Sequence, residues 1–147
     1  MTLHLIKLCV GIDTVEQLEA YRKRRQAELT AAGLPPYTRH LTRNFPRRAD
    51  EILEGGGSLY WVIRREVRAR QRLHAIEEAV DENGRPCCAL VFEPEVIRVM
   101  PRSHRPFQGW RYLEGADAPA DLPAHAVDDS AEMPEEMRRE LRALGLI

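Results

Sequence analysis

The amino-acid sequence predicts an α+β fold in which a small antiparallel β-barrel is flanked by two to three helices. The first supporting observation is the order of patterns along the chain: a strand, a long helix, a short helix, several strands and a terminal helix. The others are the apolar–polar alternation that begins at Val67 and the Asn83-Gly84 turn signal between two strand patterns. The 147 residues suit one domain over 1–115, followed by an acidic, Pro- and Ala-rich tail over 116–147.

A strand and a capped helix open the chain. Residues 3–10, LHLIKLCV, form an apolar run that predicts a strand. Thr14 and Gln17 have the form of a capping box, in which the hydroxyl accepts from the amide three residues on and Gln17 reaches back. We therefore expect a helix over 14–32, which Gly33 ends.

A short helix follows. Pro46 suits the first position of a helix, so residues 46–54 are predicted to be helical, and the glycines at 55–57 end that helix. The basic run at 22–25 within the longer helix is interpreted as a solvated face.

Residues 58–80 allow two interpretations. A helix over 61–80 is possible because several apolar residues fall near helical spacing. We favour a hairpin, in which 58–63 is a buried strand, the turn lies near Arg65-Glu66 and a second strand starts at Val67. The predicted faces of that second strand are Val67, Ala69, Gln71, Leu73 and Ala75 on one side and Arg68, Arg70, Arg72, His74 and Ile76 on the other.

The remaining segments are assigned from turn residues. Residues 81–86 predict a turn, and residues 87–100 predict one strand that is bent or broken at Pro94. A loop over 101–113 runs into a last strand around 110–113, and Pro134 opens a final helix over 134–143.

Charge is unevenly distributed along the chain. Residues 39–72 carry nine arginines against four acids, and residues 98–111 carry four arginines and no acid. Residues 73–97 carry one arginine against six acids, and from residue 113 onward nine acids face three arginines. If the two basic segments meet in the fold, they form a positive surface that attracts anions; if they lie beside the acidic segments, the charges cancel.

Other function classes are less favoured by composition. No apolar run is long enough for a membrane helix, and the N-terminus lacks the basic leader of a signal peptide, so we expect a cytoplasmic protein with no membrane association. Cys9, Cys87 and Cys88 form no CxxC pair, and the five histidines are scattered, so we expect no metal and no cofactor. The sequence leaves the oligomeric state open.

The richest candidate site is the loop that contains Arg102, His104, Arg105, Phe107, Gln108, Trp110 and Arg111. Arginine forks suit phosphate oxygens, aromatic faces suit stacked bases, and an amide side chain can recognise a base edge. In the alternative interpretation, the two aromatic rings close the end of the core and the arginines pair with acidic segments. The further predicted binding residues are Arg43, Arg47 and Arg48 at the short helix, and Trp61, Arg68 and Arg70 in the hairpin.

Catalysis has weaker support in the sequence. His104 could serve as an acid or base if the protein is an enzyme. The chain contains no GxSxG, Walker, GxGxxG or HExxH motif. A binding module is therefore favoured over an enzyme, with RNA or a phosphate-bearing small molecule as the expected partner, and a protein-interaction domain whose acidic tail docks a partner as the alternative.

Two resemblances extend these expectations. The segments LHLIKLCVGID, GGGSLYWVI and HRPFQGWRYL resemble an uncharacterised family of short alphaproteobacterial proteins, a domain of unknown function. A weaker resemblance is to the PUA/ASCH-like small β-barrels, in a helix ending in glycines, a following strand pair and a later polar-aromatic loop. That resemblance implies a barrel that binds RNA or nucleotides, or in a few members a small hydrolase. Because the only lysines are Lys7 and Lys23, outside the basic segments, the catalytic lysine of such hydrolases has no evident counterpart.

Overall fold

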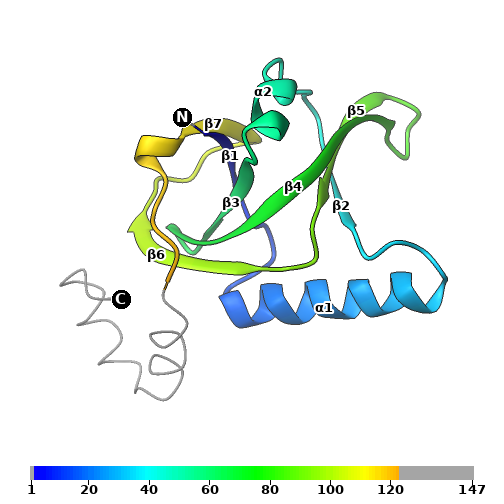
Figure 1. The fold of residues 1–147 in the computed structure, drawn as a ribbon, viewed down its shortest axis with the longest axis horizontal. Coiled ribbons are helices and arrows are strands. Elements are labelled where there is room, and N and C mark those ends of the chain that lie inside the picture. The colour runs from blue at the N-terminus through cyan, green and yellow to red at the C-terminus, as the bar shows by residue number, and fades with distance from the viewer. Residues whose placement is uncertain (1, 123–147) are drawn as a thin grey trace.

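The computed structural model describes residues 2–122, so the predicted helix over 134–143 and most of the acidic tail lie outside the described residues. Figure 1 shows a twisted sheet with α1 along one side and α2 at the opposite end. The elements are β1 (Leu3–Leu8), α1 (Val15–Ala31), β2 (Thr38–Thr42), α2 (Ala49–Glu54), β3 (Ser58–Ile63), β4 (Glu66–Val80), β5 (Pro86–Phe92), β6 (Ile97–Ser103), β7 (Trp110–Glu114) and the 3₁₀ turn η1 (Gly115–Asp117).

The seven strands form one sheet that does not close on itself. Its order is β2-β5-β4-β3-β1-β7, and β6 also pairs with β4. The α+β class is therefore observed, whereas the predicted closed barrel is not, because β2 and β7 remain edge strands. The prediction of a purely antiparallel sheet is wrong for one pair, since β1 and β3 run parallel.

The long strand β4 organises this sheet. The first half of β4 pairs with β6 and its second half pairs with β5. The consecutive strands β5 and β6 therefore use different halves of the same long strand. This confirms the prediction of one strand broken at Pro94. Residues 120–122 continue the arrangement, because Met100 N donates to Ala120 O at 2.7 Å and Leu122 N donates to Arg98 O at 2.9 Å.

The hairpin over residues 58–80 is confirmed, and the alternative helix over 61–80 is wrong. The turn lies at Arg64 and Arg65, slightly before the predicted position. Both residues adopt a left-handed backbone conformation, with φ of 50° and 65°. A two-residue hairpin turn with positive φ at both positions normally contains Asn-Gly. The sequence has Arg-Arg at these positions instead of Asn-Gly, so it predicts the location of the turn only approximately.

The predicted alternation on β4 holds only as far as Leu73. A bulge between Leu73 and Ala75 shifts the pairing with β5. As a result Ile76 is buried, with 9% of its surface exposed, whereas Ala75 is only half-buried. The prediction that Ala75 faces the core and Ile76 faces outward is therefore wrong, because an extra residue in one strand reverses the faces beyond it.

The three glycines between α2 and β3 differ in what they require. Gly56 has φ of +71°, which disfavours a side chain. A Cβ on Gly57 would lie 2.3 Å from the carbonyl oxygen of Leu3, so only glycine lets the chain pass β1 at this point. The run therefore ends α2 and brings β3 alongside β1.

Helix α1 begins as the capping box predicts. Thr14 Oγ1 accepts from Gln17 N at 3.1 Å, and Gln17 Oε1 accepts from Asp13 N at 2.7 Å. The helix places Val15 and Leu18 in the core. Neither α-helix in the described part of the chain combines the length and apolar character that crossing a membrane requires.

One strand and several element boundaries differ from the prediction. Strand β2 was not predicted at all, α2 begins at Ala49 instead of Pro46, and β6 continues through Pro101 to Ser103, where a loop was expected. Strand β2 has buried threonines at its two ends and an exposed Leu41 between them, so its pattern lacks the apolar residues that usually mark a strand. It pairs with β5 and forms one edge of the sheet.

Candidate functional site

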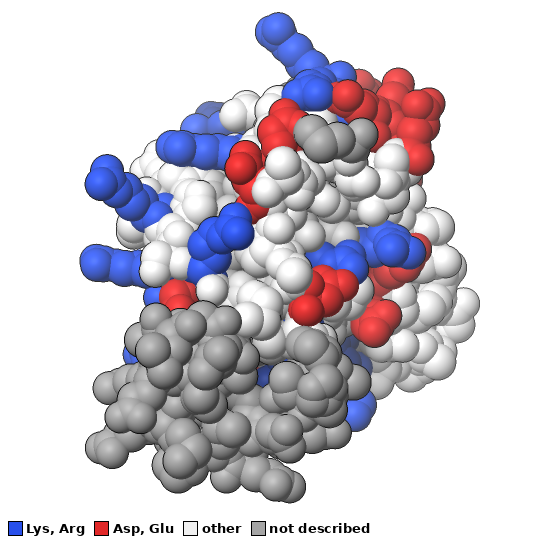
Figure 2. All heavy atoms as spheres, turned by 60° about the vertical axis from the view of Figure 1, so that its left-hand side comes forward, with Lys and Arg blue, Asp and Glu red and all other residues white. Residues whose placement is uncertain are grey.

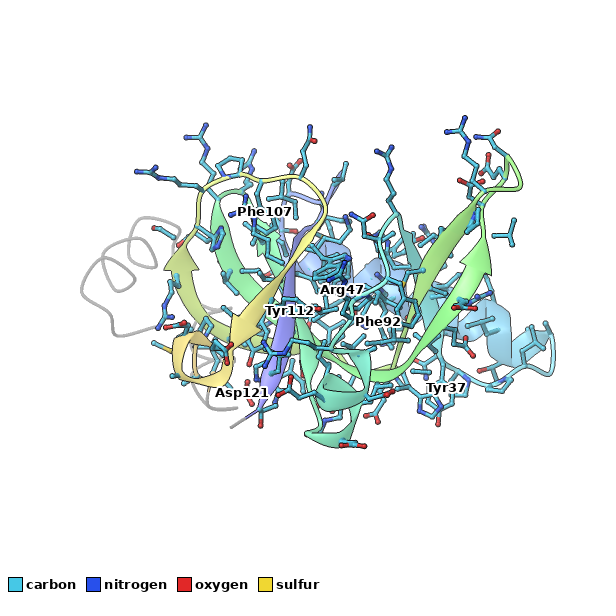
Figure 3. All side chains as sticks on the ribbon, turned by 90° about the horizontal axis from the view of Figure 1, so that it is seen from above. Tyr37, Arg47, Phe92, Phe107, Tyr112 and Asp121 are labelled. Atoms are coloured by element: carbon cyan, nitrogen blue, oxygen red, sulfur yellow. The ribbon has the colours of Figure 1, made fainter. Side chains whose placement is uncertain are left out.

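The aromatic rings predicted to stack bases are largely used inside the fold. Phe107 is 8% exposed and packs in a small core cluster beneath the loop between β6 and β7 (Figure 3). The guanidinium of Arg111 lies over its ring, 4.9 Å from the centroid. Trp110 donates its indole N–H to Asn44 O at 2.7 Å and packs edge-on against Tyr112. The interpretation in which these rings close the core therefore describes Phe107 better than base stacking does.

Two of the predicted arginines are bound by carboxylates. Arg70 donates from Nε and Nη2 to the Asp121 carboxylate, both at 2.8 Å, and from Nη1 to Ser58 Oγ. Arg48 donates to Glu51 at 2.5 Å. These two side chains are engaged within the fold, and the Arg70–Asp121 pair joins a basic segment to the acidic tail, as the alternative in which the charges cancel predicts.

The other predicted residues lie in different environments. Arg47, Arg102, Arg105 and Arg111 are exposed, and Arg102 donates to the carbonyl of Asp117. Figure 2 shows Lys and Arg side chains projecting separately along one side of the molecule, with acidic side chains between several of them. The remaining placements are simple: Arg68 is half-buried on β4, Trp61 is 1% exposed, and His104 is half-buried with its ring edge-on to Phe107.

The structure brings a different set of cations together beside β1 and β2. A pocket of about 410 Å³ lies between α1, β1 and β2; its polar lining residues include Lys7, Arg22, Arg39 and His40. A second pocket of about 490 Å³ shares Lys7 and is also lined by Thr42, Arg43, Asn44 and Gln108. We call the first the α1 pocket and the two together the β1–β2 groove. No Asp or Glu among the described residues lines either pocket.

Arg22 is the most unusual residue of this groove. Its surface is 6% exposed, and its guanidinium lies 5.5 Å from the Trp61 ring centroid and 5.1 Å from that of Phe92. Within residues 2–122 its Nε has no hydrogen-bond partner and its guanidinium forms no salt bridge. Burial lowers its pKa. The interpretation of run 22–25 as a solvated face is therefore wrong for Arg22, although Arg25 does pair with Glu28 at the surface.

Two other arginines of low exposure show the contrast. The side chain of Arg98 is 20% exposed and lies 2.6 Å from Glu19. That of Arg70 is 15% exposed and is bound by Asp121. Burial lowers the pKa of Arg98, but its carboxylate partners raise it overall, and the hydrogen bond to Asp121 raises the pKa of Arg70. Arg22 differs from both because no carboxylate of the described residues pairs with its buried charge.

Neighbouring groups in the α1 pocket also have shifted pKa values, and burial is the largest cause of each shift. Burial lowers the pKa of His40 to about 4, and the charges of Lys7 and Arg22 act in the same direction. Burial also lowers the pKa of Lys7. Burial raises the pKa of the Cys9 thiol to about 11, so at neutral pH it is not a thiolate nucleophile. The pocket is thus cationic, with a neutral imidazole and a neutral thiol in its wall.

Comparison with known proteins gives a family but no activity. The family model described as "Protein of unknown function (DUF1489)" matches residues 5–147. The chain belongs to this family. The prediction from LHLIKLCVGID, GGGSLYWVI and HRPFQGWRYL is thereby confirmed. No curated protein and no solved structure matches the chain.

In this DUF1489 protein, sequence reasoning found part of the groove and missed the rest. Arg43 and Gln108 were predicted and line it, whereas Lys7, Arg22 and Arg39 were not predicted. One signal was available for Lys7, because a lysine interrupts an otherwise apolar strand. No comparable signal exists for Arg22, since its burial depends on where α1 packs.

Proposed function

We propose that this protein binds a phosphate-bearing ligand, a nucleotide or single-stranded nucleic acid, in the β1–β2 groove. The observation that carries the proposal is the absence of a carboxylate from the described lining of two pockets that contain four cations. These are Lys7, Arg22, Arg39 and Arg43. Elsewhere on the described surface, cations such as Arg48 and Arg70 are already bound by acids.

The composition of the groove suits phosphate and base together. Arginine presents a planar fork that matches two phosphate oxygens, and lysine adds a compact charge. The amides of Asn44 and Gln108 line the second pocket and offer both donors and acceptors to a base edge. The resemblance to PUA/ASCH-like barrels, several of which bind RNA or modified nucleotides, points to the same class of ligand.

The test is direct binding by fluorescence anisotropy at low salt, with short single-stranded RNA and DNA and a fluorescent nucleotide as probes. Replacing Lys7 and Arg43 together by alanine should weaken binding at least tenfold, because each removes a charge-assisted contact. Arg25→Ala is the matched control, since Arg25 is exposed and paired with Glu28. The control should bind as the unmodified protein does.

Two outcomes would overturn the proposal. One is the absence of binding to all three probes at low salt. The other is binding that survives the Lys7 and Arg43 changes but is lost when Arg105 and Arg111 are replaced, which would place the site on the loop between β6 and β7.

A further inference from the structure

We propose that the α1 pocket holds a terminal phosphate monoester, so that the ligand of the groove is recognised by its phosphorylated end. This inference rests on the proposed function and adds the part of the ligand that is recognised. It begins from Arg22 at the wall of the pocket, which is buried, whose Nε has no hydrogen-bond partner and which forms no salt bridge within residues 2–122.

The position of Arg22 is costly in the absence of a ligand. A charge that leaves water without a carboxylate partner, as that of Arg22 does within residues 2–122, destabilises the fold, and its contacts with the Tyr21, Trp61 and Phe92 rings offset part of that cost. Arg70 and Arg98, which are less buried than Arg22, both have acid partners. An anion in the pocket would give Arg22 the partner that these two arginines already have.

The charge in the pocket favours a dianion. Lys7, Arg22 and Arg39 line it together, so three positive charges meet at one cavity. A phosphate monoester carries up to two negative charges near neutral pH, because its second pKa is about 6, whereas a diester within a chain carries one. Since attraction grows with the product of the charges, the pocket distinguishes a terminal phosphate from an internal one.

A neutral donor completes the set. His40 also lines the pocket, its Nε2 has no partner among the described residues, and its pKa of about 4 keeps the ring neutral at physiological pH. A neutral imidazole can donate one N–H to a phosphate oxygen without adding charge. The pocket volume of about 410 Å³ lies within the range of small-molecule sites, roughly 300–1,000 Å³, so it accommodates the phosphate and the attached sugar.

The experiment compares one oligonucleotide in three forms: 5′-phosphorylated, 3′-phosphorylated and without a terminal phosphate, each bound to the full chain. A phosphorylated form should bind at least tenfold more tightly than the unphosphorylated one, and inorganic phosphate should compete for the difference. Equal binding of all three forms would overturn end recognition while leaving the proposed function intact. No binding of any form would overturn both.

Two variants separate a binding role of Arg22 from a structural one. Arg22→Met should abolish the preference for the phosphorylated end, leave the weaker binding through Arg43, and raise the melting temperature without ligand. Arg98→Met is the matched control and should lower the melting temperature, because it removes the pairing with Glu19. A lower melting temperature for Arg22→Met together with a retained preference would overturn the proposal.

A third measurement does not depend on whether these variants fold. Inorganic phosphate at millimolar concentration should raise the melting temperature of the unmodified protein by mass action. It should also shift the NMR signals of the His40 ring, which lines the pocket. The absence of both effects would overturn the assignment of the α1 pocket to a phosphate group.

Discussion

Single-stranded nucleic acid in the β1–β2 groove should lose affinity steeply as salt is added, because its contacts release counterions from the phosphates. The groove offers four cations, Lys7, Arg22, Arg39 and Arg43. Each neutralised phosphate of a single strand contributes a slope of about −0.7 in log K against log salt, so four give about −3. Raising salt from about 50 to about 200 mM should then weaken binding about 50-fold.

The assay is a series of anisotropy titrations at increasing salt with the unmodified protein and single variants. Arg43→Ala should reduce the slope by about 0.7, the share of one phosphate contact, and Arg25→Ala should leave it unchanged. A slope near zero would refute the electrostatic argument. A slope well beyond four phosphates that falls when Arg105 or Arg111 is replaced would show that the ligand also covers the loop between β6 and β7.

Three further predictions concern the stability of the fold. Asp121→Asn leaves Arg70, whose side chain is 15% exposed, without its carboxylate, so the unfolding free energy in urea should fall by about 1–3 kcal/mol; an unchanged urea midpoint would contradict this. Replacing Arg64 by Asn together with Arg65 by Gly relieves two left-handed residues and should raise the unfolding free energy by about 1 kcal/mol, measured by thermal melting. Between pH 6.5 and about 4 the unfolded chain protonates His40 while the folded one does not. The free energy of unfolding should therefore decrease as the pH is lowered through that window, by about 2 kcal/mol after allowance for partial exposure. In the His40→Gln variant, the urea midpoint should depend less on pH.

The parts of the fold that sequence predicts are those set by neighbouring residues. The Thr14–Gln17 cap fixes where α1 begins, and the β-branched and aromatic run before Arg64 distinguishes a hairpin from a helix. The break at Pro94 is equally local, since proline lacks the amide that the ladder needs. Each of these features is determined within a few positions of the residue that signals it.

The parts that sequence did not predict depend on distant segments. Strand β2 exists because β5 offers it a partner, and its own pattern of two threonines around exposed residues carries little signal. The bulge after Leu73 reverses a face through pairing with β5, which no alternation within β4 reveals. Phe107 is buried because the loop that carries it packs against Val67, which lies 40 residues earlier in the sequence.

The location of the groove follows from how buried cations are paired. Arginines are numerous along the chain, and their density predicted a surface on β4 and the loop after β6, where Arg70 is in fact bound by Asp121. Arg22 stands within a run that is otherwise exposed, yet it is the buried arginine whose pKa is lowered instead of raised. The pKa values of Lys7 and His40 are lowered in the same way. The ligand-free fold therefore disfavours the charged forms of Arg22, Lys7 and His40. A bound anion would favour the charged form of each group and so oppose these shifts, which means that the cationic pocket gains stability from binding.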